Sequence, residues 1–464
     1  MVRAVTRVTT GHQLRLASFW FGISFLWGSF LALVLPFLLV PEHPGPGNPA
    51  LVPAGEKNTA LALLEGAGVV VAMVVQPAAG ALSDRMRGRF GRRRPLLAVG
   101  VLGGVVSLCL MSSIESFWLL VGVYCLLQVG MNTGQGAYQG LMPDTVPPEQ
   151  FGTASGFVGL LTLLGQVAGT LVGGFVPPRL VTYPIAAVVA ATAAITVLGV
   201  RERPAAAPPH SAREPGMRAG LRGYLAELRA YPDFCWVVAS RFLIYTGLAC
   251  IQRFAANYLR DNFSEYSLFG IVSLHSAQAA TGVVAGMVIL AGAAACYPAA
   301  RLSEQVGRRR MVVTAALFGA LASSLFFLGG PLSLIVVDAI PLGLAFGILA
   351  SVDWAYMADL APRRRAGKFL GFSNVATAGS QAFAPFLMGP VIDVVNARSA
   401  RAGYQVLFVV AAAFFIAGAV LLRRVRIQRL HQEADEAAHV AWPPGDAALD
   451  QSPRGFRTRS GTAR

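Results

Sequence analysis

The sequence predicts an all-α membrane protein with twelve transmembrane helices, arranged as two pseudo-symmetric six-helix bundles. Its composition, the spacing of its apolar stretches and an internal repeat each support this fold class. Of the 464 residues, 55% are hydrophobic and only 13% are charged, whereas a typical soluble domain carries about 25% charged residues. We therefore expect the lipid bilayer to be a partner of this chain.

Six apolar stretches in the first half of the chain are long enough to cross about 30 Å of hydrocarbon. The first contains no charged side chain and is longer than the apolar region of a signal peptide, which is about 7–15 residues. We expect it to be retained as a helix. The predicted spans lie near residues 16–40, 58–83, 95–113, 116–142, 152–176 and 178–199.

Six more spans follow a break that is rich in Pro, Ala and Arg, near residues 233–259, 271–300, 311–329, 331–358, 368–395 and 402–424. We expect the break to be a cytoplasmic linker. The chain should then divide into a cytoplasmic N-terminus, an N-terminal bundle, the linker, a C-terminal bundle and a disordered cytoplasmic tail, over residues 1–15, 16–199, 200–231, 232–425 and 426–464.

Basic residues are concentrated in the segments that share one side of the membrane with the N-terminus. Under the positive-inside rule this distribution places both termini in the cytoplasm. It also accounts for the net charge of +15 without a nucleic-acid partner. We expect an integral, multi-pass protein of the plasma (inner) membrane that works as a monomer.

Sequence signatures of enzymes are missing from the chain. It has no nucleophile elbow, no phosphate-binding loop and no HExxH pair. Its five cysteines fall inside predicted spans and form no CxxC pair. We therefore expect no enzyme activity, no metal and no cofactor, and an ATP-driven pump is disfavoured.

An internal repeat relates the two halves. The run MetProAspThrValPro at 142–147 returns 215 residues later as MetAlaAspLeuAlaPro at 357–362, and the register continues to Gln166 and Gln381. Repeats of this kind are typical of folds whose two halves surround a site near the middle of the membrane.

The run GlyAlaLeuSerAspArg at 80–85, followed by GlyArgArgArgPro at 91–95, resembles the signature of the major facilitator superfamily between helices 2 and 3. A degenerate copy at 302–310 lies where that family has its second signature. The resemblance covers about residues 12–425 and implies transport by alternating access. It also implies a latch that holds the halves in the outward-facing state, made by Asp84, Arg85, Arg92 and Arg93.

Residues 132–144 resemble the helix 4 segment of sucrose/proton symporters and their glycoside-pentoside-hexuronide relatives. Two positions depart from that pattern. Gln139 stands where sucrose symporters have Arg, and helix 2 carries only Glu65, whereas sodium-coupled sugar carriers have paired Asp residues there. Coupling to sodium through that site is therefore not expected.

A competing resemblance lies in helix 5, where Gly165, Gly169, Gly173 and Gly174 have the spacing of the antiporter motif GxxxGPxxGG. Thr170 replaces the proline of that motif. Glycines at this spacing also form packing surfaces between membrane helices.

Five charged residues fall within predicted spans and away from the span ends. A charge near the bilayer centre costs at least about 2.5–3.5 kcal/mol and needs a partner. Glu65, Arg253 and Asp338 lie in outer halves of their helices, and Arg241 and Asp353 in inner halves. We expect Arg241 to pair with Asp353, and Arg253 to pair with Asp338 or, across the halves, with Glu65. All five are candidates for coupling and gating, although permanent structural ion pairs are the alternative.

The resemblance implies a cavity lined by helices 1, 4, 7 and 10. Amide side chains on helix 4 recur at intervals of 4, 3 and 4 residues, so they share one helical face, and amides with aromatic rings suit sugar hydroxyls and pyranose rings. The candidate substrate-binding residues are Trp27, Gln128, Asn132, Gln135, Gln139, Tyr245, Gln252 and Trp354.

The sequence therefore favours a secondary active transporter for the proton-coupled uptake of a sugar or glycoside, with a small molecule and protons as partners. One alternative is proton-coupled efflux of a small hydrophobic compound, as in drug/proton antiporters. The other is a non-transporting membrane scaffold or cofactor-delivery protein on the same fold. The polar stripe on helix 4 favours the sugar, and the membrane-embedded ions disfavour the scaffold.

Overall fold

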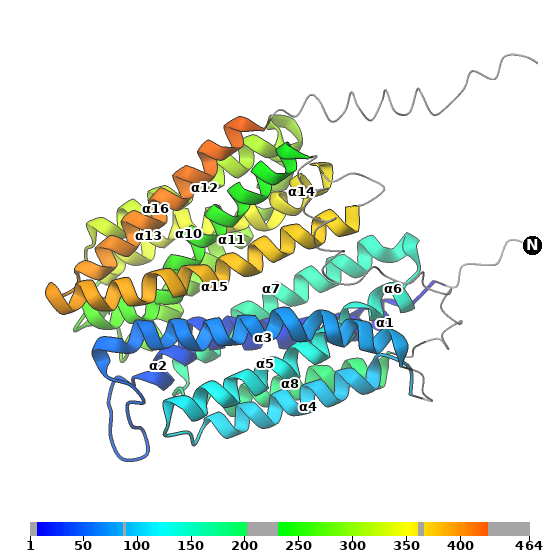
Figure 1. Cartoon of the computed structure of the whole chain (residues 1–464), viewed down its shortest axis with the longest axis horizontal. Helices are drawn as coiled ribbons and strands as arrows, with labels where there is room; N and C mark the ends of the chain where they lie inside the picture. The colour runs from blue at the N-terminus through cyan, green and yellow to red at the C-terminus, as the bar shows by residue number, and fades with distance from the viewer. Residues whose placement is uncertain (1–6, 87–89, 201, 203–230, 361–365, 426–464) are drawn as a thin grey trace, which may run out of the picture. The chain divides into compact units, whose positions relative to one another are not determined.

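A computed structural model describes residues 7–86, 90–200, 202, 231–360 and 366–425 (Figure 1). Nearly all of the predicted linker and the whole of the predicted tail lie outside these residues. Residues 1–425 form one compact unit. The description below concerns that unit.

Twelve helical segments within the described residues are long and apolar enough to cross a membrane. In the N-terminal half they are α1 (Thr10–Ser29) continued by α2 (Leu35–Leu39), α3 (Lys57–Arg85), α4 (Arg94–Met111), α5 (Phe117–Gln139) with the short α6 (Leu141–Thr145), α7 (Phe151–Phe175) and α8 (Thr182–Gly199). In the C-terminal half they are α10 (Pro232–Asn262), α11 (Ala277–Val306), α12 (Arg308–Leu328), α13 (Leu332–Ile348) continued by α14 (Trp354–Leu360), α15 (Ala366–Arg398) and α16 (Ala402–Leu421).

The predicted start of the eighth span is wrong by six residues. A β-hairpin of β1 (Tyr266–Leu268) and β2 (Val272–Leu274) takes up residues that the apolar run assigned to the helix. The helix begins only at Ala277, where the side chain of Ser276 caps it by accepting a hydrogen bond from the backbone N–H of Ala279. An apolar run alone does not distinguish a short strand from the first turn of a helix.

Two spans contain a π-helical turn, a wider turn that is frequent at functional sites. One turn, Phe30–Val34, joins α1 to α2, and the other, Leu349–Asp353, joins α13 to α14. The second turn ends on Asp353, one of the predicted intramembrane ions. Both turns therefore change the direction of side chains inside a membrane-spanning segment.

The helices pack mainly within their own half. In the N-terminal half α1 lies on α7, and α4 lies on α5 and α8, while in the C-terminal half α10 and α12 lie on α16 and α11 lies on α13. Two pairs cross between the halves, because α3 lies beside α15 and α7 beside α11 (Figure 1). Any site in the middle of the protein is therefore bounded by both halves.

The outward faces of the helices are apolar. Six large hydrophobic side chains from six different spans are between 64% and 76% exposed: Val70, Leu102, Trp118, Leu198, Leu290 and Leu328. Such surface would be unfavourable in water and is matched by hydrocarbon. The chain is an integral, multi-pass membrane protein.

The two ends of the helices are named here by what they carry. The loop end carries the 41–53 segment and the β-hairpin. The motif end carries residues 80–86, where α3 ends, residues 90–95, where α4 begins, and the start of α1.

Candidate functional site

A cavity of about 190 Å³ lies between the two halves and combines charged, amide and aromatic groups. It receives side chains from α1 and the following π-helical turn, from α3 and α5, and from α10 and α15 of the other half. Its polar lining consists of Glu65, Tyr124, Gln128, Asn132, Arg253 and Gln381. Five predicted site residues therefore line this one cavity: Trp27, Glu65, Gln128, Asn132 and Arg253.

Glu65 and Arg253 form an ion pair across the boundary of the halves. The Nε and Nη1 atoms of Arg253 each lie 3.4 Å from a carboxylate oxygen of Glu65, and Glu65 is 2% exposed. Charge-assisted N–H···O bonds are usually about 2.7–2.9 Å, so this contact is long. Within the described residues Glu65 Oε2 and Arg253 Nε have no hydrogen-bond partner of good geometry. The pair can accept a further polar group or separate.

Arg253 is held from its other side by Gln381, whose Oε1 accepts a hydrogen bond of 2.8 Å from Nη2. Gln381 is the repeat equivalent of Gln166, which lies in α7 and lines a neighbouring cavity. The repeat-related glutamines thus have different surroundings. The contact of Gln381 with the central arginine was not among the predicted pairs.

Two amides of the helix 4 stripe line the central cavity. Asn132 donates hydrogen bonds of 2.8 Å to the side-chain and backbone oxygens of Gln128, and Gln128 donates one of 2.9 Å to the hydroxyl of Tyr124. This chain fixes the three side chains along one face of α5. It leaves the amide oxygen of Asn132 and one N–H of Gln128 for another partner, since an amide offers both donors and acceptors.

The other predicted substrate-binding residues lie elsewhere. Gln139 is exposed at the last residue of α5, and Gln135 is half-buried without lining the central cavity. Gln252 lines a second, more apolar cavity that also reaches Trp27. The stripe predicted from spacing is present, but α5 extends beyond the cavity, so only its first two amides reach it.

Arg241 and Asp353 form the predicted pair, with Nη1 2.9 Å from Oδ2. The hydroxyl of Tyr245 donates to the same carboxylate oxygen at 3.2 Å, and Arg241 Nε donates to the hydroxyl of Thr377 at 2.8 Å. The guanidinium also lies over the rings of Tyr245 and Trp354, 5.3 and 5.6 Å from their centroids. Tyr245 and Trp354 are therefore partners of this pair, and every member of the cluster belongs to the C-terminal half.

Asp338, the alternative partner predicted for Arg253, is buried in α13. Arg253 contacts Glu65 and Gln381. The matching of depths along the helices therefore did not decide between the two carboxylates, because it carries no information about which helix faces point toward each other.

At the loop end, side chains of one half cap helix ends of the other half. The sequence did not predict these exchanged caps. The carboxylate of Asp393 in α15 accepts hydrogen bonds from the amide of Asn58 and from the backbone N–H and hydroxyl of Thr59, at 2.7–2.8 Å. These residues form the first turn of α3, where N–H groups lack partners within the helix and favour a negative charge. Lys57 adds a contact of 2.5 Å to Asp261 of α10.

A second exchange of caps joins α7 to α11. The side-chain amide of Gln278 donates to the carbonyl oxygens of Gly173 and Val176 at the end of α7, at 2.5 and 2.8 Å. In return, the carboxylate of Glu42 accepts the backbone N–H of Gln278 in the first turn of α11, at 3.1 Å. Helix ends of one half are thus completed by side chains of the other.

Three of the four predicted latch residues, Asp84, Arg92 and Arg93, lie in a charged cluster at the motif end, whereas Arg85 is exposed. Arg93 contacts Asp84 at 2.9 Å and Asp144 at 2.5 Å, and Arg92 makes a two-pronged contact with Asp144. Asp359, the repeat equivalent of Asp144, pairs with Arg308 in the C-terminal half. Asp84 is 56% exposed. It remains accessible to a partner from the other half.

The glycines that resemble an antiporter motif serve helix packing in this structure. An added Cβ at Gly165 or Gly169 would come within 2.2–2.3 Å of a carbonyl oxygen of α1, at Phe21 or Phe25. Only glycine permits so close an approach. Gly173 likewise packs on Ser29 of α1, whereas Gly174 packs on Gly282 of α11. This spacing therefore has a structural explanation.

Curated relatives match limited stretches of the chain. The general alpha-glucoside permease of Schizosaccharomyces pombe is 30% identical over 146 residues, which are 28% of this chain and 26% of that protein. The sucrose transport protein SUT4 of Oryza sativa subsp. indica is 25% identical over 186 residues, 35% of this chain and 29% of that protein. The multidrug transporter AQR1 of Candida glabrata is 30% identical over 105 residues, 23% of this chain and 18% of that protein. The chain thus matches less than a third of the length of each.

Solved structures match nearly the whole chain. The nucleoside transporter NupG superposes with a TM-score of 0.69 at 13% identity, covering 90% of this chain and 99% of that one. A bacterial homologue of the human lysosomal transporter Spinster superposes with a TM-score of 0.64 at 14% identity, covering 94% and 100%. At such low identity the likeness shows the fold. The family model described as Major Facilitator Superfamily matches residues 47–385 and again 240–454, and the chain is therefore a member of this superfamily.

Proposed function

We propose that this protein imports a sugar or glycoside together with protons by alternating access. The observation that carries the proposal is the Glu65–Arg253 pair in a cavity lined by amides of both halves. Amide donors and acceptors suit hydroxyl groups, and the ring of Trp27 offers an apolar surface to a pyranose. The names of two relatives, an alpha-glucoside permease and a sucrose transport protein, favour the same substrate class.

Protonation of Glu65 is the proposed coupling step. The carboxylate attracts Arg253 only while it is charged, so a proton removes most of the attraction between the halves at this point. A sugar hydroxyl could then take the place of the carboxylate beside the guanidinium. Proton binding and substrate binding would favour the same rearrangement, and the membrane potential would contribute about 2.3 kcal/mol per charge per 100 mV.

The conformation is proposed to face the cytoplasm. The charge distribution of the sequence favours cytoplasmic termini, so the loop end would lie outside, in the plasma membrane. The exchanged caps at Asp393 and Gln278 would then close the external side. Asp84 of the motif-end cluster would contact the C-terminal half only in the outward-facing conformation, in which the motif ends of the two halves come together. A monomer suffices for this cycle, because the cavity is built from one chain.

Proton-coupled efflux of a small hydrophobic compound is the second candidate. The match to a multidrug transporter and the apolar cavity beside Trp27 favour it. The helix 5 glycines do not add to it, since their packing contacts with α1 and α11 explain their spacing. The fixed amides of Gln128 and Asn132 favour the sugar.

Uptake into proteoliposomes tests the proposal. Vesicles with purified protein are given a panel of labelled sugars and glycosides under an imposed proton gradient, a sodium gradient or no gradient. Accumulation of a sugar under the proton gradient, and its loss when a protonophore is added, is the expected result. If no sugar accumulates while hydrophobic compounds cause proton release, efflux is the function instead.

A further inference from the structure

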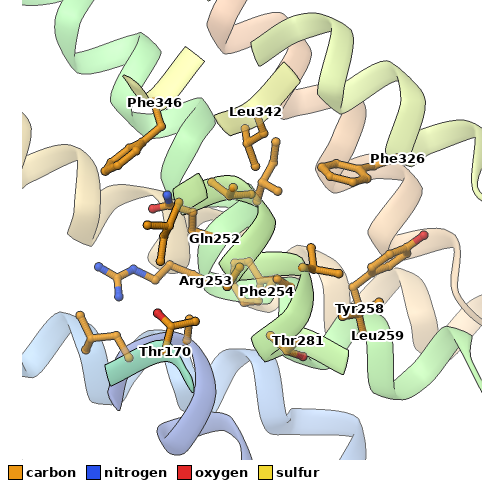
Figure 2. Close-up of a pocket in the computed structure, with 18 of the residues that line it drawn as sticks. Thr170, Gln252, Arg253, Phe254, Tyr258, Leu259, Thr281, Phe326, Leu342 and Phe346 are labelled. Atoms are coloured by element: carbon orange, nitrogen blue, oxygen red, sulfur yellow. The ribbon is translucent and has the colours of Figure 1, made fainter. Parts of the chain in front are cut away.

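A second cavity of about 200 Å³ adjoins the central one and has a different chemistry (Figure 2). Most of its lining comes from α10, α11 and α13 of the C-terminal half, with a smaller share from α1 and α7. Figure 2 shows Phe326, Leu342 and Phe346 around this cavity, with Phe254 on α10. Apolar rings and branched side chains thus form most of its walls, and Gln166, Thr170, Gln252 and Thr281 add a few polar groups.

The two cavities share three residues, Trp27, Leu31 and Arg253. In Figure 2 the guanidinium of Arg253 extends to the side of α10 away from Phe326 and Tyr258. Its nitrogens contact Glu65 and Gln381, which line the central cavity and not the second one. Arg253 therefore marks the boundary between a polar compartment and an apolar one.

The size of the apolar compartment limits what it can hold. A cavity of about 150 Å³ lined by aliphatic and aromatic side chains binds benzene. A volume of about 200 Å³ therefore suits one aromatic ring with a small substituent, or a branched alkyl group of similar size. An apolar group matches these walls better than a second sugar ring would, because most hydroxyls of such a ring would face Phe, Leu, Ile and Val side chains without a hydrogen-bond partner.

From this arrangement we infer that the substrate is an amphipathic glycoside, whose sugar binds beside Glu65, Gln128 and Asn132 and whose apolar aglycone occupies the second cavity. The inference rests on the proposed transport of a sugar or glycoside. The glycosidic oxygen would lie near Trp27 and Arg253, where the compartments meet. Burial of the aglycone would increase affinity without changing the contacts of the sugar.

Pairs of glycosides that differ only in the aglycone distinguish the contributions of the two cavities to binding. Methyl and phenyl glycosides of glucose and galactose are titrated onto the full-length protein in nanodiscs, and their dissociation constants are compared. The phenyl compound of the recognised sugar should bind about tenfold more tightly than its methyl counterpart, a difference of about 1.4 kcal/mol. Transport in proteoliposomes should show the same ratio in KM.

Two substitutions on α11 fill the apolar compartment, Ala285→Phe and Val288→Phe, because both residues line it. Each should remove the advantage of the phenyl glycoside and leave the affinity for the methyl glycoside unchanged, which also shows that the variant is folded. Leu290→Phe is the matched control, since Leu290 is 67% exposed on the outward face of the same helix. It should behave as the unsubstituted protein.

Photolabelling provides a measurement that needs no variant. An azidophenyl glycoside bound to the unsubstituted protein should label peptides of the C-terminal-half helices that line this cavity, which are α10, α11, α12, α13 and α16. Excess methyl glycoside should prevent the labelling. Equal affinity for methyl and phenyl glycosides, or labelling outside these helices, would overturn the aglycone site and leave sugar transport intact. A phenyl advantage that survives both filling substitutions would also overturn it. If neither glycoside binds, the proposed function fails and the aglycone site fails with it.

Discussion

Glu65 and Arg253 face each other across the boundary between the two halves with closest contacts of 3.4 Å, and one nitrogen of Arg253 is already hydrogen-bonded to Gln381. The ion pair Arg241–Asp353, by contrast, is shorter, at 2.9 Å, and lies within the C-terminal half. A pair between the halves changes when the halves move, whereas a pair within one half can persist. The two pairs should therefore respond differently to substitution.

Glu65→Gln should abolish proton-driven accumulation and retain exchange of substrate across the membrane. The amide is close in size to a protonated carboxyl group and cannot release a proton, so the protein should behave as if it were permanently protonated. Uptake by the unsubstituted protein should increase as the external pH falls, and uptake by the variant should be independent of pH. Radiolabelled uptake and counterflow in proteoliposomes measure both.

The matched control for that experiment is Glu56→Gln, at an exposed position just before α3. It should leave the pH profile unchanged. Proton-driven uptake by Glu65→Gln with an unaltered pH profile would show that Glu65 is not the coupling group.

Asp353→Asn should reduce stability more than it reduces coupling. Removal of one partner from a buried ion pair costs about 3–5 kcal/mol, because Arg241 would keep a buried charge beside Tyr245 and Trp354. The melting temperature of the purified protein should fall, and the double substitution Arg241→Gln with Asp353→Asn should recover part of the loss. The folded Asp353→Asn protein should still show uptake that depends on pH. Uptake that no longer depends on pH would instead assign a coupling role to the Arg241–Asp353 pair.

The fold could be predicted from the sequence because the membrane requires a local signal. Each span must be apolar and of a minimum length, so twelve spans can be recognised without any tertiary information. The hairpin at Tyr266–Leu274 was missed because its apolar side chains continue the run that leads into α11. The π-helical turns were missed because their residues are apolar and their effect depends on packing.

The site could be predicted only in part, because sequence indicates depth in the membrane but not which helix face points at which neighbour. Depth alone correctly paired Arg241 with Asp353 but left Arg253 with two possible partners. The exchanged caps have a weak signal in the sequence, since Asp393 lies near the end of a span and Asn58 and Thr59 at the start of another. Their contact joins residues more than 330 positions apart, and no local pattern links them.

Gln128→Leu should weaken sugar binding without unfolding the protein. Leu is similar in size, but it removes the amide that donates to Tyr124 and accepts from Asn132. A hydrogen bond from the remaining N–H of Gln128 to the sugar is worth about 0.5–1.5 kcal/mol, so its loss should increase KM by up to about tenfold. Loss of the internal bonds to Tyr124 and Asn132 should lower the melting temperature only modestly. Gln139→Leu, at an exposed position that does not line the cavity, should leave KM unchanged. Equal effects of the two substitutions would contradict the assignment of this cavity as the sugar site.

Asp393→Ala should shift the protein away from the conformation that is closed at the loop end. Asp393 accepts three hydrogen bonds from the first turn of α3, and bonds to a charged group contribute about 1.5–3 kcal/mol each at most. When α3 and α15 separate at the loop end, water replaces most of these hydrogen bonds. We therefore expect a net shift of about tenfold in the equilibrium between the two conformations. Because the cap lies between the halves, its loss penalises one conformation and not the other.

Spin labels at Ser113 and Ser399, exposed turns of different halves at the loop end, report the opening in a cysteine-free background. Their distance distribution should gain a longer component in Asp393→Ala. Thr9→Ala removes a cap within the N-terminal half, where the Thr9 side chain accepts from His12. That variant should lose about 1 kcal/mol of stability and keep the original distances, because both conformations contain the same cap. If Asp393→Ala also keeps them, the exchanged caps do not determine which side of the protein is closed.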